Sequence, residues 1–404
     1  MREQQSSLLL AGLAYLSFVS LGLPDGLLGV AWPSIREFFK LRLDALGPLL
    51  VMFTIGYLLS SFSSGRILSR ITVGSLLALS CLATATSLLG YTLAPRWGIM
   101  VTLGGLCGLG AGAIDAGLNT YAAMHFSART VNWLHACYGV GATIGPVIMT
   151  NVLMANRPWQ WGYGIVGLWQ LLLAVCFGLT HTWWLTSKST PDAPRPVAVR
   201  AVSHGSTLRL PVMWLSIAVF FVYTGLEAAA GTWAFSLFNE ARAMPMHAAG
   251  MWVSVYWGSL TVGRLLSGVV VSFVPVRMLL RFCIISIAFG AMLIWLNLTS
   301  LLSSLGLALM GLSSAPIFPS LIATTPERLG DAHTANGVGV QIAAAVLGQS
   351  LLPGLVGMLA HNLSLEVVGP SLLTAALLLL VLYEALTATS FKKVQDYTTE
   401  ALNP

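Results

Sequence analysis

Twelve long apolar runs divide the sequence, and this pattern limits the fold more than any other feature. Each run approaches or exceeds the roughly 20 residues that a helix needs to cross the hydrocarbon core of a bilayer. A helix also satisfies its backbone hydrogen bonds internally, as lipid requires. The runs therefore predict an all-α polytopic membrane protein with twelve transmembrane helices. Their limits are 8–31, 45–64, 75–94, 98–123, 132–154, 163–185, 211–238, 247–271, 279–297, 301–323, 335–359 and 370–390.

The composition supports a lipid bilayer as the surroundings of the chain. Hydrophobic residues make up 56% of the sequence and charged residues only 8%, whereas soluble proteins carry about 25% charged residues. The first apolar run is not followed by a small-residue cleavage site and a soluble body, so we interpret it as a retained span. The net charge of +6 does not indicate a nucleic-acid partner, because Lys and Arg commonly flank membrane spans.

The distribution of Lys and Arg predicts the orientation. With the N-terminus inside, thirteen of these residues lie in cytoplasmic segments and six in outer segments. The excess on the cytoplasmic side favours an inner-membrane protein with both termini in the cytoplasm. The outer cluster of Arg36, Lys40 and Arg42 is partly balanced by Glu37 and Asp44.

A polar, Pro-rich stretch separates the sixth run from the seventh. It predicts three parts: an N-terminal six-helix bundle at 1–186, a cytoplasmic linker at 187–210, and a C-terminal six-helix bundle with a cytoplasmic tail at 211–404. A shift of 202 residues places Asp25 on Glu227 and Gly29 on Gly231. Two parallel six-span halves of this kind are typical of transporters with a substrate site between the halves.

The first run contains the stretch Gly22-Leu23-Pro24-Asp25-Gly26. A carboxylate near the middle of a membrane helix costs roughly 2.5–3.5 kcal/mol on the insertion scale. Pro24 and the two glycines predict a helix that is bent or partly unwound at this point. We interpret Asp25 as a functional residue; the alternative is a kinked helix in which it only pairs with a neighbour.

Two more acids lie deep in predicted spans. Asp115 is in the fourth and Glu227 in the seventh. Buried acids that can be neutral or charged are natural proton carriers, so we predict that Asp25, Asp115 and Glu227 couple protons to transport. Asn119 lies four residues after Asp115, on the same helix face. Arg264, the one candidate cation within a span, cannot neutralise three acids.

Further polar and aromatic side chains are candidates for substrate binding, together with the three acids, Asn119 and Arg264. Asn132 and His135 share a face at the start of the fifth span, although a histidine there can equally serve an interhelical bond. Trp233 and Trp257 could face sugar rings, while the alternative is a role in the core or at the interface. Gln341 is a hydrogen-bond candidate in the eleventh span.

The sequence does not indicate an enzyme. It contains no Walker A loop, no HExxH and no Gly-x-Ser-x-Gly motif, and Asp115 does not follow the Gly-x-Gly sequence of an intramembrane aspartyl protease. The five cysteines lie in apolar runs without CxxC pairing, so we interpret them as small buried residues. We expect no cofactor, no metal, no nucleic acid and a monomer.

The loop after the second span resembles a conserved loop of the major facilitator superfamily. It reads Gly65-Arg66-Ile67-Leu68-Ser69-Arg70, with Ser69 where that superfamily usually has Asp. The resemblance implies the major facilitator fold and a gating role for Gly65, Arg66 and Arg70. The Asp/Ser difference removes the carboxylate of the usual charge relay.

The first, fourth and fifth spans resemble the fucose permease (fucose–proton symporter) group. The likeness rests on an acid in the first span, an acid followed four residues later by Asn in the fourth, and an Asn-x-x-polar start of the fifth. In that group the two acids serve the proton and the sugar, which implies these roles for Asp25 and Asp115. The permease has Glu at the position of Asp115 and Gln at that of His135.

The expected activity is proton-coupled symport of a small polar solute, such as a sugar or sugar derivative, by alternating access. The partners would be the solute, protons and the bilayer. Two alternatives remain open: a proton-coupled exporter of drugs or other amphipathic compounds, and a transporter-like receptor that binds its ligand without moving it.

Overall fold

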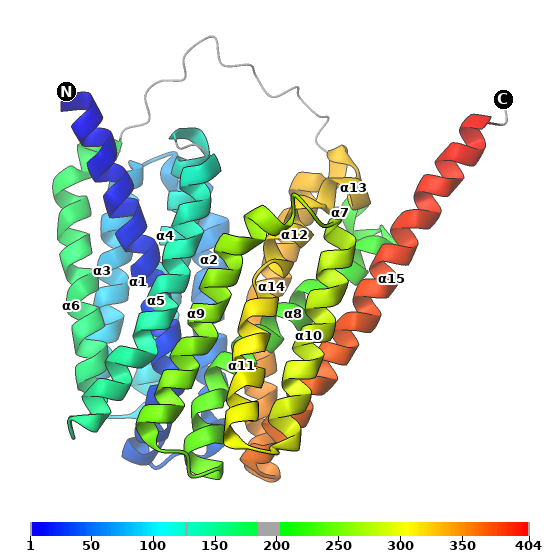
Figure 1. Ribbon diagram of the computed structural model, residues 1–404. Coiled ribbons are helices and arrows are strands. Elements are labelled where there is room, and N and C mark those ends of the chain that lie inside the picture. Colours follow the sequence, from blue (N-terminus) through cyan, green and yellow to red (C-terminus); the bar gives the residue numbers. More distant parts are fainter. Residues whose placement is uncertain (1, 126–127, 185–202, 403–404) are drawn as a thin grey trace. The chain divides into compact units, whose positions relative to one another are not determined.

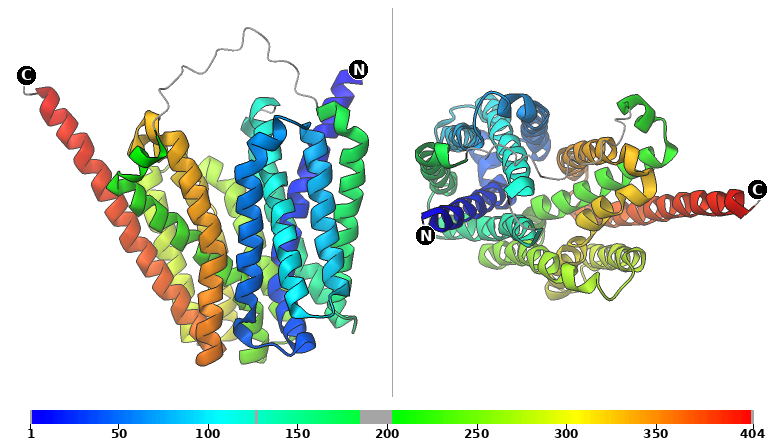
Figure 2. Two further views of the ribbon diagram at one scale, coloured as in Figure 1. Left: turned by 180° about the vertical axis from the view of Figure 1, so that it is seen from behind. Right: turned by 90° about the horizontal axis from the view of Figure 1, so that it is seen from above.

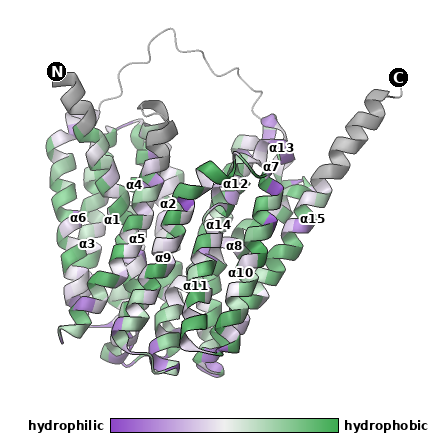
Figure 3. Ribbon diagram, viewed as in Figure 1, coloured by the Kyte–Doolittle hydropathy of each residue, from purple (hydrophilic) through white to green (hydrophobic). Residues whose placement is uncertain are grey.

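The described residues of the computed structural model are helical throughout their long segments. The model describes residues 2–125, 128–184 and 203–402, and no strand occurs among them. This confirms the prediction of an all-α protein. Figure 3 shows that apolar residues cover most of the helical surface and that polar residues are more frequent toward the helix ends, as expected for helices surrounded by lipid.

Six long helices precede residue 185 (Figure 1). They are α1 (Arg2–Phe39), α2 (Leu46–Leu68), α3 (Val73–Leu93), α4 (Trp97–His125), α5 (Ala128–Met154) and α6 (Gln160–Thr180). The 3-10 turns η1 (Leu43–Ala45) and η2 (His181–Trp184) adjoin α2 and α6.

The helices after residue 202 include one span that is broken in two. The long helices are α8 (Pro211–Ser236), α9 (Met246–Val270), α10 (Val276–Leu296), α11 (Ser300–Ser314), α14 (Asp331–Asn362) and α15 (Val368–Leu402). The tenth predicted span, 301–323, consists of α11 followed by α12 (Ile317–Ala323). The short elements are α7 (His204–Leu208), α13 (Thr325–Leu329), η3 (Leu237–Ala241, a π-helical turn) and η4 (Leu365–Val367).

Eleven segments in the described part of the chain are long and apolar enough to cross a membrane. The predicted span at 247–271 is the exception. It forms α9, which is 25 residues long but contains His247, Ser254 and Arg264 among its apolar residues. Helix α9 therefore has the length of a span and carries a charged residue, Arg264, among its apolar residues.

The structure divides into two compact units. The first comprises Met1–Pro191, Gly231–Thr261 and Gly354–Leu365, and the second comprises Asp192–Ala230, Val262–Pro353 and Glu366–Pro404. In the first unit α1 packs along α5, α2 along α4, and α3 along α4 and α6. In the second unit α10 packs along α11 and α15, and the α10–α15 pair is visible in both views of Figure 2.

Glycines set the distance between α1 and α5. A Cβ atom at Gly22 or Gly26 on α1 would lie 2.1 Å from the carbonyl oxygen of Tyr138 or 2.4 Å from that of Ala142. In return, a Cβ at Gly141 on α5 would lie 1.9 Å from the carbonyl oxygen of Val19. These distances are too short for any side chain, so the two backbones touch as in small-residue helix packing.

Helix α1 continues without interruption through Pro24, so the predicted unwinding is wrong. Proline removes one hydrogen bond of the helix, and the close contact with α5 supports the backbone on both sides of that position. The glycines beside Asp25 serve packing rather than flexibility. They hold the backbone of α1 around Asp25 against α5.

The pair α2–α4 has the same construction. A Cβ at Gly108 would lie 1.9 Å from the carbonyl oxygen of Phe53, and one at Gly112 would lie 2.4 Å from that of Tyr57. The glycines before Asp115 therefore serve the close packing of α4 on α2. This packing places Asp115 within hydrogen-bond distance of Tyr57 on α2.

Candidate functional site

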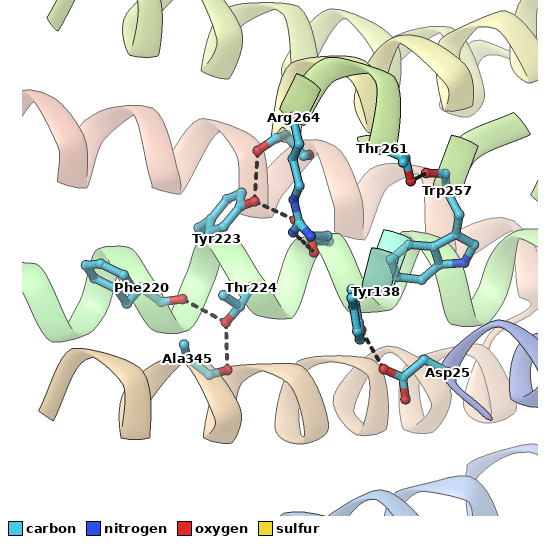
Figure 4. A network of polar contacts seen from close by, with 11 residues as sticks. Asp25, Tyr138, Phe220, Tyr223, Thr224, Trp257, Thr261, Arg264 and Ala345 are labelled. Atoms are coloured by element: carbon cyan, nitrogen blue, oxygen red, sulfur yellow. Dashed lines mark hydrogen bonds and ion pairs between the residues drawn. The ribbon is translucent and has the colours of Figure 1, made fainter. Parts of the chain in front are cut away.

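Asp25 on α1 accepts a hydrogen bond from a tyrosine on α5. The hydroxyl group of Tyr138 donates to Asp25 Oδ2 at 2.6 Å (Figure 4). The Asp25 side chain is exposed, although Leu23, Gly26 and Leu27 around it are buried. A carboxylate in the middle of a span faces protein or water rather than lipid. Asp25 is therefore an exposed carboxylate among buried neighbours, held by a hydroxyl group from α5.

Asp115 on α4 accepts two hydrogen bonds. Its Oδ2 accepts from the hydroxyl group of Tyr57 on α2 at 2.6 Å, and its Oδ1 accepts from Nδ2 of Asn119 at 2.9 Å. The predicted pairing of Asp115 and Asn119 on one helix face is thus present. Both side chains are half-buried, so each can still reach a solute.

Asp25, Asp115 and the tyrosines that bond them, Tyr138 and Tyr57, all belong to the first unit. In that unit each aspartate is therefore held by a tyrosine hydroxyl group from another helix.

Glu227 on α8 lies in the second unit and has a different set of partners. Tyr223, one turn earlier on α8, contacts Glu227 Oε2 through its hydroxyl group. A nitrogen of the Arg264 guanidinium lies 3.7 Å from Glu227 Oε1. Glu227 is only 6% exposed. Arg264, the candidate cation within a span, therefore pairs with Glu227, and each carboxylate oxygen has a partner.

The two tryptophans that the sequence offers as candidates, Trp233 and Trp257, are both buried. Trp233 is completely buried, and a Cβ at Gly357 would lie 2.6 Å from its ring. Trp257 is 6% exposed, and its Nε1 has no hydrogen-bond partner in the described structure. The ring of Trp257 packs against Gly231, where a Cβ would lie 2.5 Å from it. Both rings are therefore part of the packed interior, which supports the alternative of a role in the core.

The other candidates are distributed over several elements. His135 is exposed, and the edge of its ring meets Phe18 at 5.3 Å between centroids. The side chain of Asn132 lies outside the described part of the structure. Gln341 is fully buried, and its Oε1 accepts a hydrogen bond of 3.0 Å from Thr325.

The predicted gating loop forms the end of α2 and the following turn. Gly65, Arg66 and Arg70 are exposed, and the hydroxyl group of Ser69 donates to the backbone oxygen of Arg66 at 2.7 Å. Ser69, at the position where the superfamily usually has Asp, thus caps its own turn. Within the described residues no ion pair involves Arg66 or Arg70.

Sequence reasoning missed the tyrosines that hold the three acids. The four-residue spacing of Tyr223 and Glu227 was a usable signal, because residues so spaced share a helix face. Tyr57 and Tyr138 lie on other helices than their acids, 58 and 113 positions away. No periodicity links residues so far apart. Within the described residues no group of three or more His, Cys, Asp or Glu side chains could hold a metal.

Comparison with known proteins identifies the family. The model of the Major Facilitator Superfamily matches residues 14–353. The chain belongs to this superfamily. The family and the structural neighbours are membrane transporters and not enzymes, and the resemblance of the loop after α2 is thereby confirmed at the level of the superfamily.

Similar proteins include two from eukaryotes. The chain is 23% identical to the sodium-dependent glucose transporter 1A of Mus musculus, over 91% of this chain and 94% of that protein. It is 22% identical to the bypass of stop codon protein 6 of Saccharomyces cerevisiae, over 86% of this chain and 76% of that protein.

Two solved structures share the fold. The nucleoside transporter NupG has a TM-score of 0.75 at 14% identity, with 93% of this chain and 98% of that chain covered. The transporter FucP in its outward conformation has a TM-score of 0.62 at 12% identity, with 94% and 99% covered. A second FucP structure describes a fucose:proton symporter, which agrees with the resemblance drawn from the first, fourth and fifth spans.

Proposed function

We propose that this protein is a secondary active transporter that moves a small, neutral, hydroxyl-rich solute together with protons. One observation carries the proposal: Asp25 is a carboxylate at the middle of a membrane helix, exposed on one side and held by Tyr138 on the other. Such a group can bind a proton or a solute without any rearrangement of the helix pair that carries it.

The chemistry of the first unit suits a sugar or a sugar derivative. Asp25 and Asp115 accept hydrogen bonds from hydroxyl groups, and Asn119 can donate and accept. Similar proteins carry names that refer to glucose, nucleosides and fucose. These names support the same class of solute for this chain.

The hydrogen bonds of Asp25 and Asp115 favour protons as the coupling ion. Asp25 accepts from one tyrosine, while Asp115 accepts from a tyrosine and an asparagine. A carboxylate with a single hydroxyl donor can accept or release a proton by a small rotation of that hydroxyl, whereas metal cations need several oxygen ligands around them. Some similar proteins are named as sodium-dependent, so the coupling ion is part of the test.

The topology belongs to the same proposal. In this proposal two six-helix halves, 1–186 and 211–404, alternate access to the solute between the two sides of the membrane. The protein lies in the inner membrane as a monomer, and both termini are in the cytoplasm. The excess of Lys and Arg in the predicted cytoplasmic loops supports this orientation.

Uptake by membrane vesicles tests the proposal. A thermal-shift screen of the purified protein against sugars, nucleosides, organic anions and cationic drugs first finds a stabilising ligand, because any such ligand binds the folded state. We expect Asp25→Asn and Asp115→Asn each to abolish uptake driven by a proton gradient, whereas Asp44→Asn, in an exposed pair with Arg42, does not. Intact proton-driven uptake in both span variants, or uptake that follows sodium alone, would refute proton coupling. Drug efflux without sugar uptake would favour an exporter.

A further inference from the structure

The hydroxyl group of Tyr223 is in contact with two acceptors. One is Glu227 Oε2 on its own helix, and the other is the backbone carbonyl oxygen of Ser314 at 2.8 Å. Two dashed lines leave this hydroxyl in Figure 4. A hydroxyl group carries one proton and a carbonyl oxygen cannot donate. Both contacts are full hydrogen bonds only if Glu227 is protonated and donates to the tyrosine oxygen.

Thr224, the neighbour of Tyr223, makes a useful contrast. Its hydroxyl group contacts the carbonyl oxygens of Phe220 at 2.8 Å and Ala345 at 2.7 Å. Neither partner of Thr224 can carry a proton, so the single proton of Thr224 is shared between them. Tyr223 differs because one of its partners is an acid. Its hydrogen-bond pattern can therefore depend on protonation.

Ser314 marks the break in the tenth span. It is the last residue of α11, Pro316 precedes α12, and a second proline, Pro319, lies inside α12. Prolines lack the N–H groups that would continue the helical hydrogen bonds, and the last four carbonyl groups of a helix have no intrahelical donor. The hydroxyl group of Tyr223 supplies a donor to one of these carbonyl groups. Tyr223 thus links α8 to the break between α11 and α12.

We propose that Tyr223 is a positioning residue that couples the protonation of Glu227 to this break. With a proton on Glu227, the carboxyl group donates to Tyr223 and Tyr223 donates to the carbonyl oxygen of Ser314. When Glu227 loses the proton, the ionised carboxylate takes the only proton of Tyr223, because a charged acceptor forms the stronger bond. Ser314 then loses its donor. The inference rests on the proposed role of Glu227 as a proton carrier.

The surroundings of Glu227 suit a group with two states. Glu227 is 6% exposed, and a nitrogen of Arg264 on α9 lies 3.7 Å from its Oε1, the other oxygen of the carboxyl group. On α11 and α14 the carbonyl groups of Ser314 and Ala345, which carry no charge, accept from Tyr223 and Thr224. A cation near one oxygen and a hydroxyl group at the other are compatible with both the neutral and the ionised carboxyl group.

Infrared difference spectroscopy of the purified protein in lipid tests the proton without any substrate. We expect a carbonyl band of a protonated carboxyl group that appears on acidification and shifts in D₂O. Glu227→Gln should remove this band, and Tyr223→Phe should change its frequency because the carboxyl group loses its acceptor. Tyr138→Phe, which acts at Asp25, should leave it in place. A spectrum in which Glu227→Gln removes no band would overturn the proposal, since Glu227 would then be ionised and the proton of Tyr223 merely shared.

A double-mutant cycle separates coupling from a purely structural role. The pH profile of counterflow or uptake is compared in wild type, Tyr223→Phe, Glu227→Gln and the double variant. We expect Tyr223→Phe to shift the profile of the wild type and to have no effect on the profile in the Glu227→Gln background. An equal shift in both backgrounds would contradict the coupling. Because the infrared measurement needs no solute, failure of the proposed sugar transport and failure of this inference are distinguishable.

Discussion

Gly22 on α1 and Tyr138 on α5 lie in direct backbone contact. A Cβ atom at Gly22 would be 2.1 Å from the carbonyl oxygen of Tyr138, while the hydroxyl group of the same tyrosine holds Asp25 at 2.6 Å. One residue on α5 therefore both receives the close approach of α1 and orients the carboxylate that α1 carries. A change in the packing of α1 on α5 would therefore also change the hydrogen bond to Asp25.

The first prediction concerns that contact. Gly22→Val should lower the free energy of unfolding by about 1–3 kcal/mol or more, as overpacking does. The new side chain would meet backbone atoms that cannot move aside. Thermal unfolding in detergent measures the effect. Gly12→Val, on the same helix, is the matched control, since no atom lies within 4 Å of a Cβ at Gly12. Equal stability of the two variants would contradict the close packing of α1 and α5.

The second prediction concerns the tyrosine hydroxyl group. Tyr138→Phe removes the hydrogen bond that favours the charged form of Asp25, and we expect the pH midpoint of proton-driven uptake to move to higher pH by about one unit or less, as the loss of one hydrogen bond implies. Uptake of the stabilising solute across a pH series measures it. Tyr15→Phe on α1, for which no side-chain bond is found in the described structure, should leave the midpoint unchanged. An unchanged midpoint in Tyr138→Phe would show that Asp25 does not govern the profile.

The third prediction concerns Arg328 on α13, which is 8% exposed. Its guanidinium donates to the carbonyl oxygen of Leu321, at the end of α12, and to Thr325 Oγ1 at 3.2 Å. Arg328→Ala should cost about 1–3 kcal/mol, because a buried carbonyl group loses its donor. Arg209→Ala, at an exposed arginine, is the control in thermal unfolding and should change stability little.

The pH dependence of that loss follows from the burial of Arg328. Burial lowers the pKa of the Arg328 guanidinium from its ordinary value to about 10. Between these two values the unfolded chain binds more protons than the folded chain, so stability attributable to this group rises with pH only there. Below about pH 10 both states are protonated. The difference between wild type and Arg328→Ala should therefore be the same at acidic and neutral pH, and a difference that changes across this range would contradict the assignment.

The fourth prediction concerns the ion pair of Arg36 and Glu240. It joins the end of α1 to η3, beside a cavity of about 440 Å³ that Glu37 and Lys40 also line. The two side chains are 28% and 23% exposed, so the pair should contribute about 1 kcal/mol or less and lose strength in high salt. Arg36→Glu and Glu240→Arg should each lower the unfolding temperature at low salt. The double reversal should restore it; a double variant no better than the single ones would show that the pair is not formed.

Several features of the site could be predicted from the sequence because they depend on one helix at a time. The cost of a charge in lipid singled out Asp25, Asp115 and Glu227, and the four-residue spacing paired Asp115 with Asn119, as the hydrogen bond between them confirms. Two glycines that the shift of 202 residues aligns also approach each other closely. A Cβ at Gly29 would lie 2.8 Å from the carbonyl oxygen of Gly231, its equivalent in the repeat.

The sequence by itself determined the class of the protein, the approximate limits of its spans and the depth of its acids, because hydrophobicity and helical periodicity act along the chain. Only the tertiary structure decided which groups hold those acids. Tyr57 and Tyr138 reach their carboxylates across helix pairs whose separation is set by glycines. Tyr223 reaches the carbonyl group of Ser314 because a neighbouring span is broken by proline. Such contacts depend on how far one helix is rotated and shifted against another, and no pattern within a single helix contains that information.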